Sequence, residues 1–549
     1  MKRAAATKAL TAIWNIDPID SGDESPNEVN EDYNSDTEQT RIDDSTNDSN
    51  DDSSDDEISN QGQGDVSRMC SEDKNKWIKL EVNTNNAKGR CRKRDIFRVQ
   101  PGVVPSVKRE ATTEVRAFNC FISENIKRQI LKCTVDASEG ALDDLTLDEL
   151  DKFFAIEIAR GVYGKNHSVK LLWSEKFGIP LFRNIMCRNR YEKIKRFLRF
   201  DEKRTRSFRI DEDPFTHVRE IFDKIAKSCR ENFVPNFSLC IDEQLVPMKT
   251  RCRFVVYMPN KPDKFGFKFW LLVDNSTKYV WNIVPYLGKC EAPDRNGERL
   301  ADFAVKKLLS SLERKSYNIT CDNFFTSVSL ANYLSSKQTT LVGTVRTNSR
   351  GLPEEMKSES LELHETCFYY SQSDEILALK HQGKQKKSVC LLTTMHVNPK
   401  CDESGKRKPF PILFYNKNKC GVDAADSMLR LYSTRAASRR WPVTIWHNML
   451  DVALLNSWIV FKESKDSEIP RKVFLLNLVE QLACTQARAV TPLQFPPPYR
   501  DASTKRKYGV IMCKNRRSVK CRSCGIFLCG SHCDNAIEKF ALTTCANCL

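Results

Sequence analysis

The sequence predicts an α/β protein with one mixed sheet, flanked by helical segments and followed by a small cysteine-rich domain. Between residues 117 and 233, apolar residues recur every third or fourth position, as in amphipathic helices. They then form four successive strand-like segments, after which helix-like and strand-like segments alternate up to residue 345. Finally, seven of the 22 cysteines fall in the last 37 residues. Such clustering indicates a metal-binding tail.

Residues 1–110 are predicted to be a disordered acidic tail and a basic linker. From Asp17 to Asp73 there are twenty carboxylates, two arginines and few apolar residues, so this stretch cannot repay its ordering entropy. The chain carries +15 in total, so the remainder carries about +33. This charge favours a polyanionic partner, and the alternative is a basic protein with scattered lysines. The basic run 88–94 is typical of a nuclear import signal or a phosphate-binding arm.

Residues 111–236 are predicted to be helical, and residues 237–349 to form the sheet. The helix-like segments of the second range are 299–312 and 327–336. Its strand-like segments are 237–246, 253–258, 267–274, 279–287, 317–322 and 340–345.

The remainder of the chain divides by composition into four further parts. We expect a polar, β-leaning insertion, an amphipathic helix that begins after Gly421, long helices, and the cysteine-rich domain, at 350–408, 409–432, 433–500 and 508–549 respectively. We expect no membrane span and no secretory signal, because no uninterrupted apolar run reaches about eighteen residues and the start lacks a long apolar stretch.

Four aspartates from distant segments are candidate metal ligands. Asp242 lies on an apolar strand and Asp322 ends another, where a carboxylate is costly unless positive charge compensates it. Asp423 and Asp426 are three residues apart and so share one helix face. Together they could hold Mg²⁺, which prefers oxygen ligands. Singly, each has a simpler explanation; Asp423, for example, could match the charge of a helix N-terminus.

Six motifs resemble those of the piggyBac transposases. They occur in the family's order and with similar separations, and the resemblance spans residues 118–548. They are IDEQL (241–245), PNKPDKFGFK (259–268), TCDNFFTS (320–327), VGTVR (342–346), GVDAAD (421–426) and RRWP (439–442).

The resemblance implies an RNase H-like catalytic domain, broken by an insertion and held between two halves of a helical dimerisation and DNA-binding domain. Asp242, Asp322 and Asp423 match the family's catalytic aspartates, and Asp426 matches its additional nearby aspartate. Two Mg²⁺ ions would support hydrolysis and strand transfer. The DNA partners implied are terminal inverted repeats and a TTAA target, with DNA hairpins as intermediates.

Basic residues flank the aspartates in sequence, where phosphate must approach. Lys268 also lies in this stretch, although for any single residue an exposed, non-binding role is the simpler expectation. Trp441 could stack on an unpaired base, and helix packing is an equal alternative. The candidates for DNA binding are Lys249, Arg251, Arg253, Lys261, Lys264, Arg346, Arg350, Arg435, Arg439, Arg440 and Trp441.

The tail has ligands at spacings that suit tetrahedral Zn²⁺. They are Cys513, Cys521, Cys524, Cys529, His532, Cys533, Cys545 and Cys548. The tail resembles the family's cross-brace finger with two zinc ions, which helps to recognise transposon ends. That finger begins with a Cys-x2-Cys pair, but Val510 stands three residues before Cys513. Cys533 could replace the missing ligand, or this site could bind weakly.

These features favour a nuclear, homodimeric, metal-dependent DNA transposase. The alternative is a domesticated, piggyBac-derived nuclear DNA-binding protein that no longer transposes. A third hypothesis, a zinc-dependent adaptor without DNA cleavage, requires the motif agreement to be accidental or vestigial. The intact set of aspartates favours the first hypothesis, and the incomplete zinc pattern favours the second.

Overall fold

The computed structural model describes most of the chain between residues 77 and 484. The described ranges are 77–81, 96–164, 167–259, 261–288, 297–436 and 438–484, together with the backbone of β13 (Arg506–Lys507) and β14 (Arg516–Arg517). The acidic stretch, the basic run 88–94 and the proposed zinc ligands lie outside the described residues.

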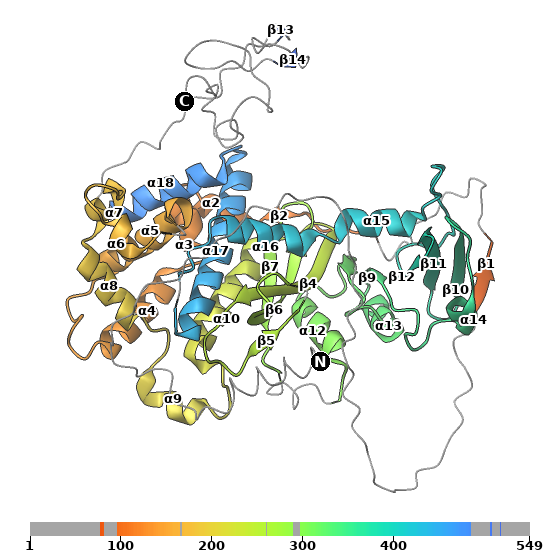
Figure 1. Ribbon diagram of the computed structural model, residues 1–549, viewed down its shortest axis with the longest axis horizontal. Helices are drawn as coiled ribbons and strands as arrows, with labels where there is room; N and C mark the ends of the chain where they lie inside the picture. The colour runs from red at the N-terminus through yellow and green to blue at the C-terminus, as the bar shows by residue number, and fades with distance from the viewer. Residues whose placement is uncertain are drawn as a thin grey trace, which may run out of the picture.

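One mixed sheet forms the centre of the molecule (Figure 1). In the described part of the chain it has ten strands, in the order β1-β10-β11-β12-β9-β8-β4-β6-β5, with β7 also paired to β6. The central strands are β4 (Ser238–Pro247), β5 (Val255–Tyr257), β6 (Phe265–Asp274), β7 (Val280–Pro285), β8 (Asn318–Cys321) and β9 (Thr340–Thr344). Each of them lies within, or within two residues of, a segment predicted from the sequence.

Parallel strands lie in the middle of this sheet, with antiparallel pairs on both sides. β4, β8 and β9 run parallel, whereas β6 runs antiparallel to β4, β5 and β7. Helices α12 (Leu300–Leu309) and α13 (Val328–Ser336) connect the parallel strands, as parallel pairing requires a crossover. The prediction of an α/β fold with one mixed sheet is therefore confirmed.

Residues 350–408 extend the same sheet. This range contains α14 (Glu354–Ser358), β10 (Thr366–Ser371), β11 (Ile376–Lys384) and β12 (Lys387–Thr393), and β12 pairs antiparallel with β9. The sheet thus runs without a break from the strands that carry the candidate aspartates to the outer strands, at the right of Figure 1.

Two parts of the range 1–110, residues 77–81 and 96–110, belong to the described structure. β1 (Trp77–Leu80) pairs with β10, while β2 (Gly102–Val103) pairs with β3 (Phe233–Val234). Residues 77–81 and 96–110 are therefore ordered and do not belong to a disordered tail. The polar composition of this range does not reveal the pairing, because the partner strands lie far along the chain.

The helical part is built from both ends of the described chain. Gln481 accepts a hydrogen bond from the Val115 N–H (3.0 Å), and the Asn477 amide donates to Glu114 (2.8 Å). The helices before the sheet are α2 (Pro105–Glu110), α3 (Glu114–Asn119), α4 (Glu124–Ala137), α5 (Leu147–Tyr163), α6 (Val169–Leu172), α7 (Pro180–Ile185), α8 (Arg188–Phe197), α9 (Lys203–Arg209) and α10 (Thr216–Asn232). Those after it are α15 (Phe410–Asn418), α16 (Gly421–Leu431), α17 (Trp441–Lys465) and α18 (Arg471–Ala483).

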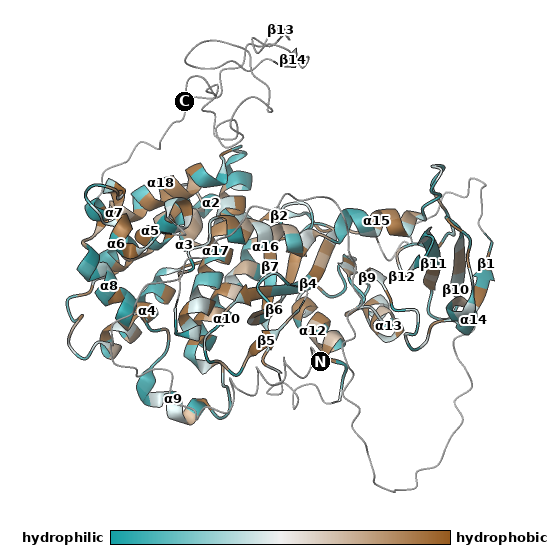
Figure 2. Cartoon of the chain, in the orientation of Figure 1, coloured by the Kyte–Doolittle hydropathy of each residue, from teal (hydrophilic) through white to brown (hydrophobic). Residues whose placement is uncertain are grey.

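The core is largely apolar in the sheet, whereas the helical part also buries charged residues. Figure 2 shows hydrophobic residues along the central strands, and Trp270 on β6 is fully buried. In the helical part, Glu157 of α5 is fully buried beside Arg160, Tyr191 and His447. A buried charge requires such partners. None of the described helices has the length and hydropathy needed to cross a membrane.

Candidate active site

Asp242 and Asp322 lie side by side because β4 and β8 are parallel neighbours. Ile241 pairs with Cys321, so the next residue on each strand is an aspartate. Since β8 ends at Cys321 while β4 continues, Asp322 stands where the two strands part. There the Phe324 N–H donates to Asp322 Oδ1 (3.0 Å), and the Glu243 N–H donates to Asp242 Oδ1 (2.8 Å).

Glu243 completes an acidic cluster that the sequence analysis missed. Carboxylate oxygens of Asp242, Glu243 and Asp322 all lie within 4.8 Å of one another, and this is the only such group among the described residues. Strand alternation places neighbouring side chains on opposite faces of a sheet, so the strand pattern alone does not predict that Glu243 lies beside Asp242. Its position next to an aspartate within an apolar strand was the available signal.

Burial makes this cluster a poor place for uncompensated negative charge. It raises the pKa of Asp242 well above its usual range, and Glu243 and Asp322 raise it further. Burial, followed by the charge of Glu243, raises the pKa of Asp322 to about 6. Close carboxylates in a desolvated site share a proton or bind a cation. Their oxygen donors fit a hard divalent ion such as Mg²⁺.

α16 starts in close contact with β4, and Gly421 permits this contact. A Cβ atom at Gly421 would lie 2.2 Å from Asn275 Oδ1 and 2.6 Å from Cys240 Cβ. The Cys240 thiol donates to the Lys419 carbonyl (3.2 Å) just before the helix begins. Asp423 lies in the first turn of this helix. Burial raises the pKa of the Cys240 thiol to about 12, and the negative charges of Asp242 and Asp423 add to this effect. Asp423 therefore lies near β4, but outside the cluster of three.

Asp426 points to other partners. Its Oδ1 accepts a hydrogen bond from the Gln244 amide (2.7 Å), and its Oδ2 accepts one from Arg430 Nε (2.8 Å). Arg430 also binds Asp263 (2.9 Å). The structure thus brings together two of the four predicted metal ligands, and Asp426 is held in an ion pair.

The comparison with protein families agrees with this geometry. The family model described as Transposase IS4 matches residues 113–458, a range that contains all four aspartates and Glu243.

The chain belongs to the Transposase IS4 family.

The individual proteins to which this chain is similar include piggyBac proteins. PiggyBac transposable element-derived protein 3 of Homo sapiens is 23% identical over 476 residues, which cover 82% of this chain and 77% of the relative. The chimeric ERCC6-PGBD3 protein of Homo sapiens is also 23% identical, with 43% of its length covered. A solved piggyBac transposase synaptic complex with hairpin DNA has a TM-score of 0.66 and 29% identity, and covers 82% of this chain and all of its own. The resemblance to piggyBac proteins is confirmed.

Most of the basic residues that the sequence analysis proposes for DNA binding lie at the surface of the chain. Lys261 is partly buried, and the Arg435 guanidinium donates to the Pro247 carbonyl (2.9 Å). The exposed ones are Lys249, Arg251, Arg253, Lys264, Arg346, Arg350 and Arg439.

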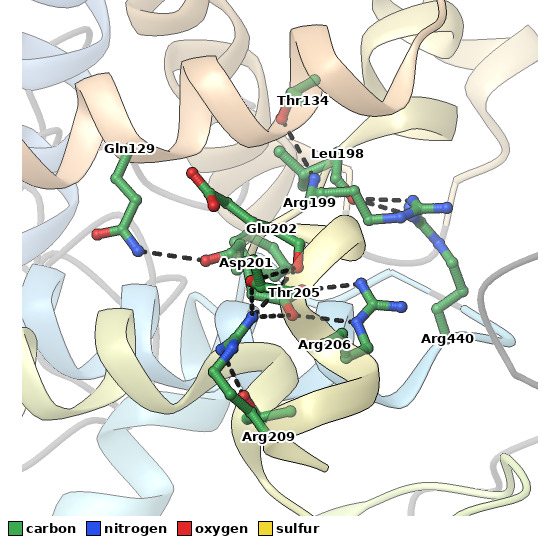
Figure 3. Close-up of polar contacts among 12 residues, drawn as sticks. Gln129, Thr134, Leu198, Arg199, Asp201, Glu202, Thr205, Arg206, Arg209 and Arg440 are labelled. Carbon is green, nitrogen blue, oxygen red and sulfur yellow. Dashed lines mark hydrogen bonds and ion pairs between the residues drawn. The ribbon is translucent and has the colours of Figure 1, made fainter.

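Arg440 and Trp441 have packing roles in the structure. The Arg440 guanidinium donates to the carbonyls of Leu198 (2.9 Å) and Lys195 (2.7 Å), and so joins α17 to the end of α8. Figure 3 shows Arg440 directed at Leu198. Trp441 is 5% exposed and stacks on Phe215. For Trp441 this is the packing role left open by the sequence.

Arg440→Ala is expected to lower the free energy of unfolding by about 1.5–3 kcal/mol, because charge-assisted hydrogen bonds to two carbonyls are lost. The neighbouring Arg439→Ala removes the same charge from an exposed position and should change stability by less than about 0.5 kcal/mol. Urea unfolding of both variants measures the difference. Loss of DNA affinity in Arg440→Ala without loss of stability would instead support the phosphate-binding role.

Proposed function

We propose that the chain is a cut-and-paste DNA transposase, which cleaves transposon ends and inserts them at TTAA by two-metal-ion hydrolysis and strand transfer. The observation that carries the proposal is the cluster of Asp242, Glu243 and Asp322 in a member of the Transposase IS4 family. The solved piggyBac relative is described as a synaptic complex with hairpin DNA. This supports double-stranded DNA as the partner and hairpins as intermediates.

The chain's own residues would act by holding fixed negative charge. Asp242, Asp322 and Asp423 are the proposed ligands of two Mg²⁺ ions, with Glu243 beside them. Mg²⁺ held by these carboxylates would lower the pKa of a water molecule and stabilise the negative charge on the departing 3′ oxygen. Water attacks phosphorus and the P–O3′ bond breaks. The freed 3′-hydroxyl then attacks the opposite strand, so that each bond formed to phosphorus replaces one broken. No covalent bond to the protein forms.

The net charge of +15 supports DNA binding by the full chain. We further propose that the chain acts as a homodimer in the nucleus. The test uses a plasmid that carries the inverted repeats and TTAA sites flanking the coding DNA. With Mg²⁺ the purified full chain should release the segment with hairpin ends, and EDTA should stop the reaction. Binding to these ends without cleavage in Mg²⁺ would favour the second candidate.

That second candidate is a domesticated nuclear DNA-binding protein without transposition activity. The observation that favours it is Val510, which stands where the family's finger has the first cysteine of a Cys-x2-Cys pair. If its recognition domain is weakened in this way, the chain would bind transposon ends less specifically. The cleavage assay separates the two candidates directly.

Zinc removal is expected to impair recognition of transposon ends more than strand chemistry. Cys521, Cys524, Cys545 and Cys548 form two complete pairs and can build one tetrahedral site. The other site has Cys513, Cys529 and His532, with Cys533 or water as the fourth ligand. Metal analysis of the purified chain should find between about one and two zinc ions, with the weaker removed first by chelator. Equal affinity for terminal DNA after complete zinc removal would contradict this role.

A further inference from the structure

Lys268 lies close to the acidic cluster, on the strand next to β4. Lys268 lies on β6 opposite Leu245 of β4. Three aromatic rings surround its ammonium group: Nζ is 4.9 Å from the ring centroid of Phe324, 5.5 Å from that of Tyr286 and 6.0 Å from that of Trp270. Ring faces attract a cation and restrict where it can move. The ammonium is therefore held in a defined place.

Two of these rings are tied to the acidic cluster. Phe324 donates its N–H to Asp322, and Trp270 pairs with Glu243 across β4 and β6. The ammonium of Lys268 is thus held between the segments that carry two of the three carboxylates. Burial lowers the pKa of Lys268, and the negative charges of Glu243, Asp322 and Asp242 partly oppose this effect.

Lys268 nevertheless forms no ion pair within 4.0 Å with a described carboxylate. Its positive charge acts on the cluster from a short distance and does not occupy the carboxylate oxygens. A cation that enters between these oxygens would meet the repulsion of a fixed ammonium group. At separations of several ångströms this repulsion changes binding severalfold even with strong solvent screening.

We propose that Lys268 is a positioning residue that serves as the counter-charge of the metal-free cluster. It holds the three carboxylates together in the absence of a metal ion, and it opposes the entry of a divalent cation. The proposal rests on the proposed metal site and adds a determinant of its affinity. Mg²⁺ binding then depends on the balance between three carboxylates and one ammonium group.

The test is a titration of the full chain with Mg²⁺ in the absence of DNA. The measured quantity is the shift in melting temperature at each Mg²⁺ concentration. Lys268→Met removes the charge and keeps the length of the side chain, and should lower the half-saturating Mg²⁺ concentration by about tenfold. Lys268→Arg keeps the charge and should match the wild type. Lys306→Met is the matched control, because Lys306 also lies over a ring, that of Tyr333 (4.3 Å), and pairs with Glu298 away from the cluster.

Two outcomes count against the inference, one against the role of Lys268 and one against the metal site on which it rests. An unchanged or higher half-saturating concentration for Lys268→Met, with normal titration of the wild type, means that Lys268 does not oppose the cation. If Lys268→Met fails to fold, Lys268→Gln takes its place in the same titration. If Mg²⁺ leaves the melting temperature of the wild type and every variant unchanged, the proposed metal site itself fails.

Discussion

Asp242→Asn and Asp322→Asn are each expected to reduce DNA cleavage by more than about a thousandfold, which corresponds to about 4 kcal/mol of lost transition-state stabilisation. A neutral amide is a poor ligand for Mg²⁺, while its volume and most packing contacts are retained. The affinity for DNA should change little, because the lost charge is negative. Plasmid cleavage at saturating Mg²⁺ and a separate binding measurement in EDTA test the two parts.

Variants of the neighbouring acidic residues locate the limits of the site. Asp423→Asn should be as severe as the first two, as its match to the family motif implies. Asp426→Asn should be milder, since Gln244 and Arg430 already engage both of its oxygens. Near-normal cleavage by two of the variants at Asp242, Asp322 and Asp423 would end the proposal of a catalytic cluster.

The second large effect is on stability. Arg160→Met is expected to lower the free energy of unfolding by about 3–5 kcal/mol, because it leaves the fully buried Glu157 without its nearest cation. Arg160 lies 3.6 Å from Glu157 and donates to the Tyr191 hydroxyl (3.1 Å), which in turn donates to Glu157. His447 is no substitute, since burial lowers its pKa to about 4 and keeps it neutral. Urea unfolding measures the loss.

The control for this prediction is Arg128→Met on α4. Arg128 also pairs with a glutamate of its own helix, Glu124, but both side chains are 66% exposed. An exposed pair at this spacing contributes about 0.3–0.5 kcal/mol. Similar losses in the two variants would show that burial of Glu157 does not decide the effect.

The central strands could be predicted closely because their residues alternate or form apolar runs bounded by polar turns. The meeting of Asp242 with Asp322 follows from parallel pairing, which the crossover helix α12 permits. The inclusion of Glu243 could not be predicted in this way. The alternation of side chains along a strand predicts the face of the sheet from which each side chain projects. It does not predict whether a side chain such as that of Glu243 contacts residues beyond the end of the neighbouring strand.

Contacts between residues that are far apart in the chain could not be predicted from the sequence either. Arg440 carries the same charge and lies in the same motif as Arg439, yet only Arg440 binds the carbonyls of Leu198 and Lys195. Nothing local distinguishes the two arginines, because the difference arises from where the end of α8 packs. β1 is a similar case: its four residues, Trp77–Leu80, form a strand through pairing with β10.

The unbroken sheet connects the candidate active site to the outer strands. β9 pairs with β8 on one side and with β12 on the other, at Val342, Gly343 and Thr344. Two hydrogen-bonded ladders, β12 with β9 and β9 with β8, therefore separate β12 from the strand that precedes Asp322. Asp322, which directly follows β8, is therefore joined to the outer strands by an unbroken series of hydrogen-bonded strand pairs.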